Sequence, residues 1–175
     1  MEVSVFCSAN EHLDPEFYEL TEALGKLIAE RGHKLVFGGT NLGLMEAVAR
    51  GAHLAGGVTV GVIPSIVEKR GCCSEHVDVA VWCDNLSDRK DLMIDRSDVL
   101  IALPGGVGTL DEVFTVLASS SIGYHHKKVL LYNMKGFWTS LITMMDDLQK
   151  QGVIRGNWRD TLVVVDSLEQ ISAYL

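Results

Sequence analysis

Short apolar runs alternate with segments of helical periodicity along the whole chain. The runs are continuous rather than alternating, which is typical of strands buried on both faces of a parallel sheet. Strands are predicted over residues 3–6, 35–37, 58–63, 77–82, 99–103, 129–132 and 162–165. Helices are predicted over 15–31, 42–55, 86–97, 109–121, 137–151 and 168–175, and 67–76 is expected to be a loop. This order predicts an α/β fold, a parallel sheet with helices on both faces, built as a single domain over residues 1–175.

The composition narrows the class of protein. Hydrophobic residues make up 47% of the chain, so a packed core is expected. The formal net charge of −8 argues against partners such as nucleic acid or an anionic membrane surface. We see no signal peptide and no apolar stretch of membrane-spanning length, so a cytoplasmic protein is expected. The four cysteines lack a metal-binding spacing, and no metal is expected.

The most informative motif reads LPGGVGTLDE and joins a predicted strand to a predicted helix. Glycine lets the backbone approach a ligand closely, and the free N–H groups of a helix start attract an anion. Gly105, Gly106 and Gly108 therefore predict a site for a phosphate-bearing small molecule. The alternative is a tight turn with a capping box, in which Thr109 and Glu112 satisfy each other's backbone N–H groups.

Two further features point to the same edge of the sheet. A second glycine turn, which contains Gly39, also follows a strand and opens a helix. Arg89 and Lys90 lie near the start of the helix before the key strand, where two cations oppose the helix dipole. An anionic ligand or a carboxylate would remove that conflict; the alternative is ordinary surface charge. A P-loop motif is missing, and a dinucleotide site is disfavoured because GxGxxG and the acidic ribose partner are both missing.

Three motifs together give a specific resemblance. The sequence resembles the Lonely Guy (LOG) family of cytokinin-activating phosphoribohydrolases, long catalogued as lysine decarboxylases. The family's PGGxGTxxE motif matches residues 104–112, its glycine turn matches 38–45, and its Arg-Lys pair matches Arg89 and Lys90. The resemblance implies a Rossmann-like fold and a homodimer with both sites close to the interface. Helices bearing Met93 or residues 113–117 are expected to supply the dimer contact.

The resemblance also implies an activity. It is hydrolysis of the N-glycosidic bond of a purine nucleoside 5′-monophosphate, cytokinin-type or AMP, to the free base and ribose 5-phosphate, without a cofactor. The family's catalytic arginine and glutamate fall on Arg89 and Glu112, and Lys90 matches a further substrate contact. The family's phosphate loop falls on Gly106, Val107, Gly108 and Thr109. The chemistry of the residues agrees, because a carboxylate can stabilise an oxocarbenium ion or activate water, and a cation can hold the ribose or phosphate.

Four positions depart from the family pattern: Ala9, Glu46, Leu86 and Ala118 stand where the family usually has Ser, Gly, Met and Thr. They weaken the expectation of a cytokinin substrate more than that of the reaction. A second function remains open, a nucleotide-binding sensor or carrier without turnover. Pyridoxal-phosphate decarboxylation is a third and poor option, since it needs a Schiff-base lysine beside the phosphate loop.

Overall fold

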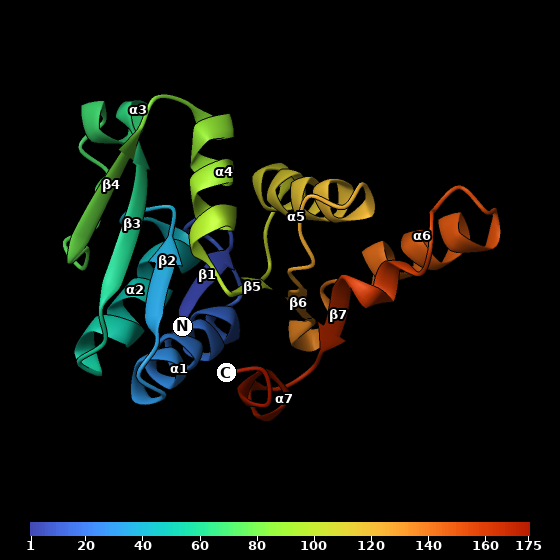
Figure 1. The fold of residues 1–175 in the computed structure, drawn as a ribbon. Coiled ribbons are helices and arrows are strands. Elements are labelled where there is room, and N and C mark those ends of the chain that lie inside the picture. The colour runs from blue at the N-terminus through green and yellow to red at the C-terminus, as the bar shows by residue number, and fades with distance from the viewer.

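Seven parallel strands form one sheet in the computed structural model, which describes residues 1–175 (Figure 1). Their order across the sheet is β4-β3-β2-β1-β5-β6-β7. The strands are β1 (Glu2–Phe6), β2 (Lys34–Phe37), β3 (Thr59–Pro64), β4 (Val79–Cys83), β5 (Val99–Ala102), β6 (Val129–Tyr132) and β7 (Leu162–Val165). Each neighbouring pair is parallel, so the predicted fold class is confirmed.

Helices cover both faces of this sheet. They are α1 (Pro15–Glu30), α2 (Gly43–Leu54), α3 (Ser65–Lys69), α4 (Leu86–Arg96), α5 (Val107–Ser121), α6 (Thr139–Lys150) and α7 (Leu168–Ser172), with the 3₁₀ turns η1 (Met134–Gly136) and η2 (Trp158–Asp160). Figure 1 shows α1 and α2 on one side of the sheet and α4 on the other. None of these helices is long and apolar enough to cross a membrane.

The core has two halves because successive side chains of a strand point to opposite faces. In β1, Val3 and Val5 face α1, α2 and α7, whereas Phe6 faces α4, α5 and α6. All three side chains are at most 1% exposed. A continuous apolar strand thus contributes side chains to the core on both faces of the sheet, which is what the pattern in the sequence predicted.

The order in which strands are added to the sheet changes direction at β1, so the topological switch point lies between the neighbouring strands β1 and β5. Strands β2, β3 and β4 extend to one side of β1, and β5, β6 and β7 extend to the other. Phe6 at the end of β1 pairs in register with Ala102 at the end of β5. In open parallel sheets, a ligand crevice forms outside the carboxyl ends of strands at such a switch point.

The element boundaries follow local chemistry closely, with two informative errors. Asp14 caps α1 by accepting a hydrogen bond from Glu16 N, and Gly32 follows the helix with a φ of 73°, as the sequence indicated. Helix α5, however, starts at Val107 rather than Thr109, with Gly106 at its N-cap and no capping side chain. The sequence also missed the short helix α3, whose residues 67–69 fall in the expected loop.

Candidate active site

A pocket of about 440 Å³ opens at the switch point, over the carboxyl ends of β1 and β5. Three segments supply most of its wall: the turn after β1, the start of α2 and the start of α5. A side chain from α4 completes it. The lining residues are Cys7, Ser8, Ala9, Asn10, Met45, Arg89, Gly106, Gly108, Thr109 and Glu112. A larger groove of about 710 Å³ lies elsewhere, between α5, α6 and the 153–161 segment, and it contains none of the predicted site residues.

An ion pair stands inside the pocket. Arg89 Nη2 of α4 donates a hydrogen bond to Glu112 Oε1 of α5 at 2.8 Å. The two side chains are 13% and 3% exposed, so both charges are largely removed from water. Arg89 Nε is also buried and has no hydrogen-bond partner in the protein. The guanidinium therefore retains a donor beyond the one that it gives to Glu112.

Burial shifts the protonation of the buried carboxyl. It raises the pKa of Glu112 to about 7, while the charge and hydrogen bond of Arg89 act in the opposite direction. A carboxyl with a pKa near neutral pH can exchange protons readily in either direction, which suits acid–base chemistry. The neighbouring thiol is different. Burial and, secondarily, the charge of Glu112 raise the pKa of Cys7 well above its usual value. The Cys7 thiol therefore stays uncharged in the wall of the pocket.

A second ion pair runs parallel to the first, outside the pocket. Lys90 Nζ donates to both carboxylate oxygens of Asp111 at 2.8 Å. The conflict of two cations near the start of α4 is therefore removed by carboxylates of α5. Two adjacent residues of α4 thus pair with two adjacent residues of α5, and this double ion pair holds the two helices together beside the pocket.

The start of α5 presents backbone donors to the pocket. The first N–H groups of a helix have no partner within it, and no side chain caps these ones. A Cβ at Gly106 or Gly108 would meet no atom within 4 Å, so the absence of a side chain leaves open space on the ligand side. Gly105 is needed for another reason, because a Cβ there would overlap the buried Thr109 side chain.

This geometry excludes the capping-box alternative. Thr109 lies inside the first turn of α5 rather than at its N-cap, and the carboxylate of Glu112 pairs with Arg89. The sequence placed the helix start two residues too late because it looked for a capping side chain. Gly106, with a φ of −98° and a ψ of −146°, begins the helix without one.

The glycine turn after β2 supports the pocket mainly through packing. A Cβ at Gly38 would lie 2.9 Å from Met45 Sδ and 3.3 Å from Arg89 Nη1, so glycine leaves room for both side chains. Gly39 has a φ of 74° and packs against Ile63. Two residues further on, Asn41 donates its backbone N–H to Cys72 O at 2.9 Å.

The structure thus brings together five of the nine predicted site residues: Arg89, Gly106, Gly108, Thr109 and Glu112. The other four do not line the pocket: Gly39, Lys90, Gly105 and Val107. Contact of any of the nine with a ligand stays a prediction. Val107 points outward and is 84% exposed.

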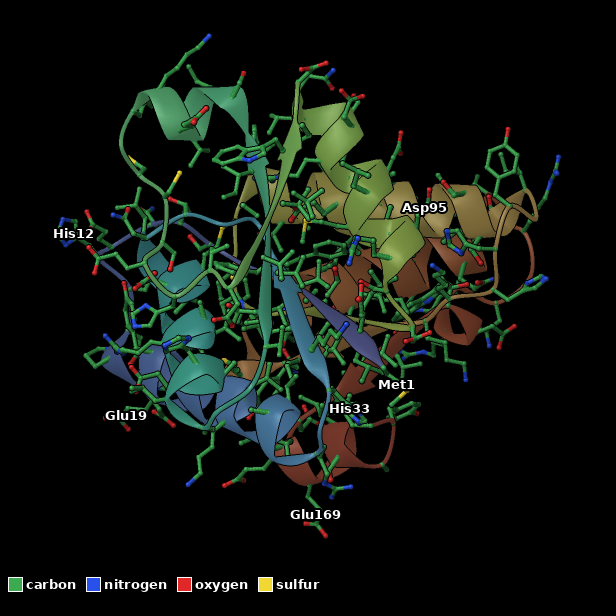
Figure 2. The ribbon with its side chains drawn as sticks, turned by 60° about the vertical axis from the view of Figure 1, so that its left-hand side comes forward. Met1, His12, Glu19, His33, Asp95 and Glu169 are labelled. Atoms are coloured by element: carbon green, nitrogen blue, oxygen red, sulfur yellow. The ribbon has the colours of Figure 1, made fainter.

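Five lining residues were not in the predicted site, and four of them, residues 7–10, directly follow β1. The turn of Ser8, Ala9 and Asn10 lies on the pocket because β1 borders the switch point, which could have been inferred from the strand order. Met45 ends the glycine motif at residues 38–45, and that motif could have indicated it. Figure 2 shows His12, slightly further along the same loop, on the outside of the molecule, and it does not line the pocket.

Comparison with known proteins gives consistent results. A Mycobacterium tuberculosis protein named cytokinin riboside 5′-monophosphate phosphoribohydrolase is 38% identical over 167 residues, covering 95% of this chain and 89% of that protein. A Mycobacterium marinum protein of the same name is 37% identical over the same shares of both chains. Among solved structures, the molybdenum cofactor carrier protein of Chlamydomonas reinhardtii matches with a TM-score of 0.75 and 26% identity, covering 99% of this chain and 94% of that one.

The family model described as "possible lysine decarboxylase" matches residues 45–175. This range contains α4 and α5, and with them both ion pairs. The match covers most of the chain, and the named relatives span nearly all of it. The chain therefore belongs to the LOG family, whose model carries that older description.

Proposed function

We propose that this protein hydrolyses the N-glycosidic bond of a purine nucleoside 5′-monophosphate, cytokinin-type or AMP, releasing the free base and ribose 5-phosphate. The observation that carries the proposal is the buried Arg89–Glu112 pair, set 2.8 Å apart beside the open start of α5. The names of the relatives support the reaction class. The choice between adenine and a modified adenine rests with experiment.

In this proposal the start of α5 binds the 5′-phosphate. The donors are backbone N–H groups of Gly106, Gly108 and Thr109, and the positive end of the helix dipole favours the anion. Glu112 lies one turn further along the same helix, on the inner side of the pocket. A phosphate held at the helix start would therefore bring the ribose toward the carboxylate.

The chemical step needs a proton acceptor for the attacking water and a cation that offsets the negative charges in the pocket. Water adds to C1′ of the ribose, the C1′–N bond breaks, and the base leaves with the bonding electron pair and gains a proton. Positive charge develops on the ribose as the bond breaks, and the Glu112 carboxylate can stabilise that charge or accept a proton from the attacking water. The guanidinium of Arg89 would hold the nucleotide and offset the negative charges of the phosphate and Glu112.

The older family description implies pyridoxal phosphate, and the pocket does not fit that cofactor. A pyridoxal-phosphate enzyme needs a lysine beside the phosphate site to form the Schiff base. No lysine lines this pocket, and the nearest candidate, Lys90, is held outside it by both oxygens of Asp111. The cation inside is Arg89, whose guanidinium cannot form that linkage.

A panel of nucleoside 5′-monophosphates tests the proposal. Each would be incubated with the protein, and free base and ribose 5-phosphate would be quantified together. Equal amounts of the two products from at least one purine nucleotide are expected. Adenosine is the matched control, because it has the same glycosidic bond without the phosphate. Release of base from none of the nucleotides would contradict the proposal.

A carrier or sensor that binds a nucleotide without turnover is the second candidate. It is favoured by the structural match to a protein described as a molybdenum cofactor carrier. A pure binder requires the open helix start but not the buried pair of Arg89 and Glu112. Tight binding of AMP with no product would favour the carrier.

A further inference from the structure

The segment between α3 and β4 is attached to the glycine turn after β2. Asn41 N donates to Cys72 O, and Ser74 N donates to Gly39 O, each at 2.9 Å. Thr40 and Cys73 form an isolated antiparallel bridge between these two bonds. These contacts are all made by the backbone, so the segment lies along the turn with little dependence on side-chain identity.

One side-chain pair ties the same segment to α2. His76 Nδ1 lies 2.7 Å from Glu46 Oε1, with the side chains 24% and 22% exposed. The second oxygen, Glu46 Oε2, is buried and has no hydrogen-bond partner. The carboxylate of Glu46 therefore depends on a single imidazole. Glu46 is also one of the positions where the sequence departs from the family pattern.

The pair belongs to a small cluster of charged and titratable groups. The ring of His76 packs edge-on against the ring of His53, with centroids 5.3 Å apart. His53 Nδ1 in turn lies 3.6 Å from Asp78 Oδ1. The two imidazoles are thus held between two carboxylates, and Glu46 and His53 come from the same helix. This arrangement keeps His76 facing the first turn of α2.

The first turn of α2 is part of the pocket. Met45, next to Glu46, lines it. Leu44 N donates to Ser8 O at 2.9 Å, which joins the helix start to the turn after β1. A Cβ at Gly43 would lie 2.6 Å from Asn10 O, so the helix and that turn are in direct contact. Any displacement of this helix start would therefore move two walls of the pocket together.

We propose that Glu46 and His76 are positioning residues: the imidazole satisfies the partly buried Glu46 carboxylate, which lets the start of α2 stay against the turn after β1, and so sets the affinity of the pocket for its ligand. Neither residue lines the pocket. The identity of the ligand as a nucleotide rests on the proposed function, whereas the mechanical link does not.

Glu46 and His76 do not contribute equally to their contact, and this difference makes the proposal testable. Removing the imidazole leaves a partly buried carboxylate without a partner, and the helix start must shift to hydrate it. Removing both side chains leaves no charge to hydrate. His76→Ala should therefore do more damage than the double variant Glu46→Ala/His76→Ala. His76→Asn keeps an N–H donor near the position of Nδ1 and should restore much of the loss.

Hydrogen–deuterium exchange of the free protein, followed by mass spectrometry, tests the mechanical link without any ligand. In His76→Ala, faster exchange is expected in peptides that cover residues 8–10 and 43–46, as well as around 72–76. The double variant and His76→Asn should return the first two regions toward wild type. Asp146→Asn, which breaks the remote pair with Arg159, is the control. Faster exchange confined to 72–76 would overturn the proposal, whatever the protein does with nucleotides.

Kinetics with the best nucleotide of the panel test the consequence. His76→Ala should raise KM by about fivefold or more while kcat stays within about twofold, because leaving a buried polar group unpaired disturbs the pocket wall rather than the reacting groups. If the wild type binds AMP without turnover, the Kd for AMP replaces KM, so failure of the proposed function is distinguished from failure of this inference. Equal KM or Kd values for His76→Ala and the double variant would also overturn it.

Discussion

Arg89 Nη2 and Glu112 Oε1 lie 2.8 Å apart across the switch point, although 23 positions separate the two residues in the sequence. The contact joins the helix before β5 to the helix after it. A buried pair of this kind is weak evidence for stability, because desolvating two charges offsets much of their attraction. Its location in a pocket beside an open helix start points instead to a role with a ligand.

Glu112→Gln should lower turnover steeply while leaving nucleotide binding in place. Glutamine keeps the size and a hydrogen-bond acceptor for Arg89 but removes the negative charge. A positioned acid–base group contributes ~10²–10⁴-fold, and we expect a loss of that order in base release. Calorimetry with AMP measures the binding, and Asp146→Asn is a control for a remote ion pair. A fully active variant would remove Glu112 from the chemistry, since the helix start does not depend on it as a cap.

The pH dependence of kcat/KM should contain an ionisation near pH 7. The pKa of Glu112 is raised to about 7 by burial, against the opposing effect of Arg89. If the carboxylate form is the active one, kcat/KM rises with pH up to about 7 and levels off above it. The phosphate of the substrate ionises near pH 6, so the two steps must be separated.

Carbon-13 NMR of the side-chain carboxyls makes that separation in the free protein. The Glu112 resonance is identified by its loss in Glu112→Gln, and its midpoint should fall near pH 7. A midpoint at the ordinary glutamate value of 4.5 would contradict the assignment.

Gly108→Val and Gly105→Ala should fail in different ways. A side chain at Gly108 meets open space, so the protein should fold normally, but the added bulk would block the phosphate and weaken AMP binding by ~10-fold or more. A methyl group at Gly105 overlaps Thr109, and overpacking of this kind typically costs 1–3 kcal/mol of stability. Thermal melts and calorimetry with AMP and adenosine separate the two effects. If Gly108→Val weakened AMP and adenosine binding equally, the phosphate assignment would be wrong.

We predict a homodimer, formed through the outer face of α5 and the groove beside α6. Met93, Val113 and Val116, which the sequence suggested for this contact, are at most 1% exposed and pack in the core. Phe114 is 36% exposed and Ile122 is 62% exposed, and both line the groove. Small-angle scattering at micromolar concentration should show a dimer.

Phe114→Glu tests the location of that contact, since a charge on the groove should shift the protein toward monomer. Leu54→Glu is a matched control at an apolar position that is 76% exposed on α2, away from the groove. A monomeric wild type would contradict the prediction of a dimer, and equal effects of the two substitutions would contradict its placement.

The sequence predicted features whose cause is local. Asp14 and Pro15 mark the start of α1 through capping and a fixed φ, and the structure confirms both. The position of the site was also predictable, because parallel strands bring their carboxyl ends to one edge. Arg89 and Lys90 indicated a nearby carboxylate or anionic ligand, because their positive charges conflict with the dipole at the start of their helix.

Features that depend on packing between distant segments could not be predicted. The packing of the Met45 sulfur beside Arg89, in the space that Gly38 leaves, is one such feature. The start of α5 was misplaced because the helix begins without a capping side chain, which no residue pattern marks. The pairing of Glu46 with His76 joins residues 30 positions apart, and nothing in either local segment indicates it.

The uncapped start of α5 has a thermodynamic consequence. A helix with glycine at its N-cap, as α5 has, is less stable by roughly a few tenths of a kcal/mol than one with a capping side chain. An anion at this position would accept hydrogen bonds from the same N–H groups, so the ligand itself would serve as the missing N-cap. Substrate binding and folding are then linked equilibria, so the protein should resist unfolding better in a cell rich in substrate than in a starved one.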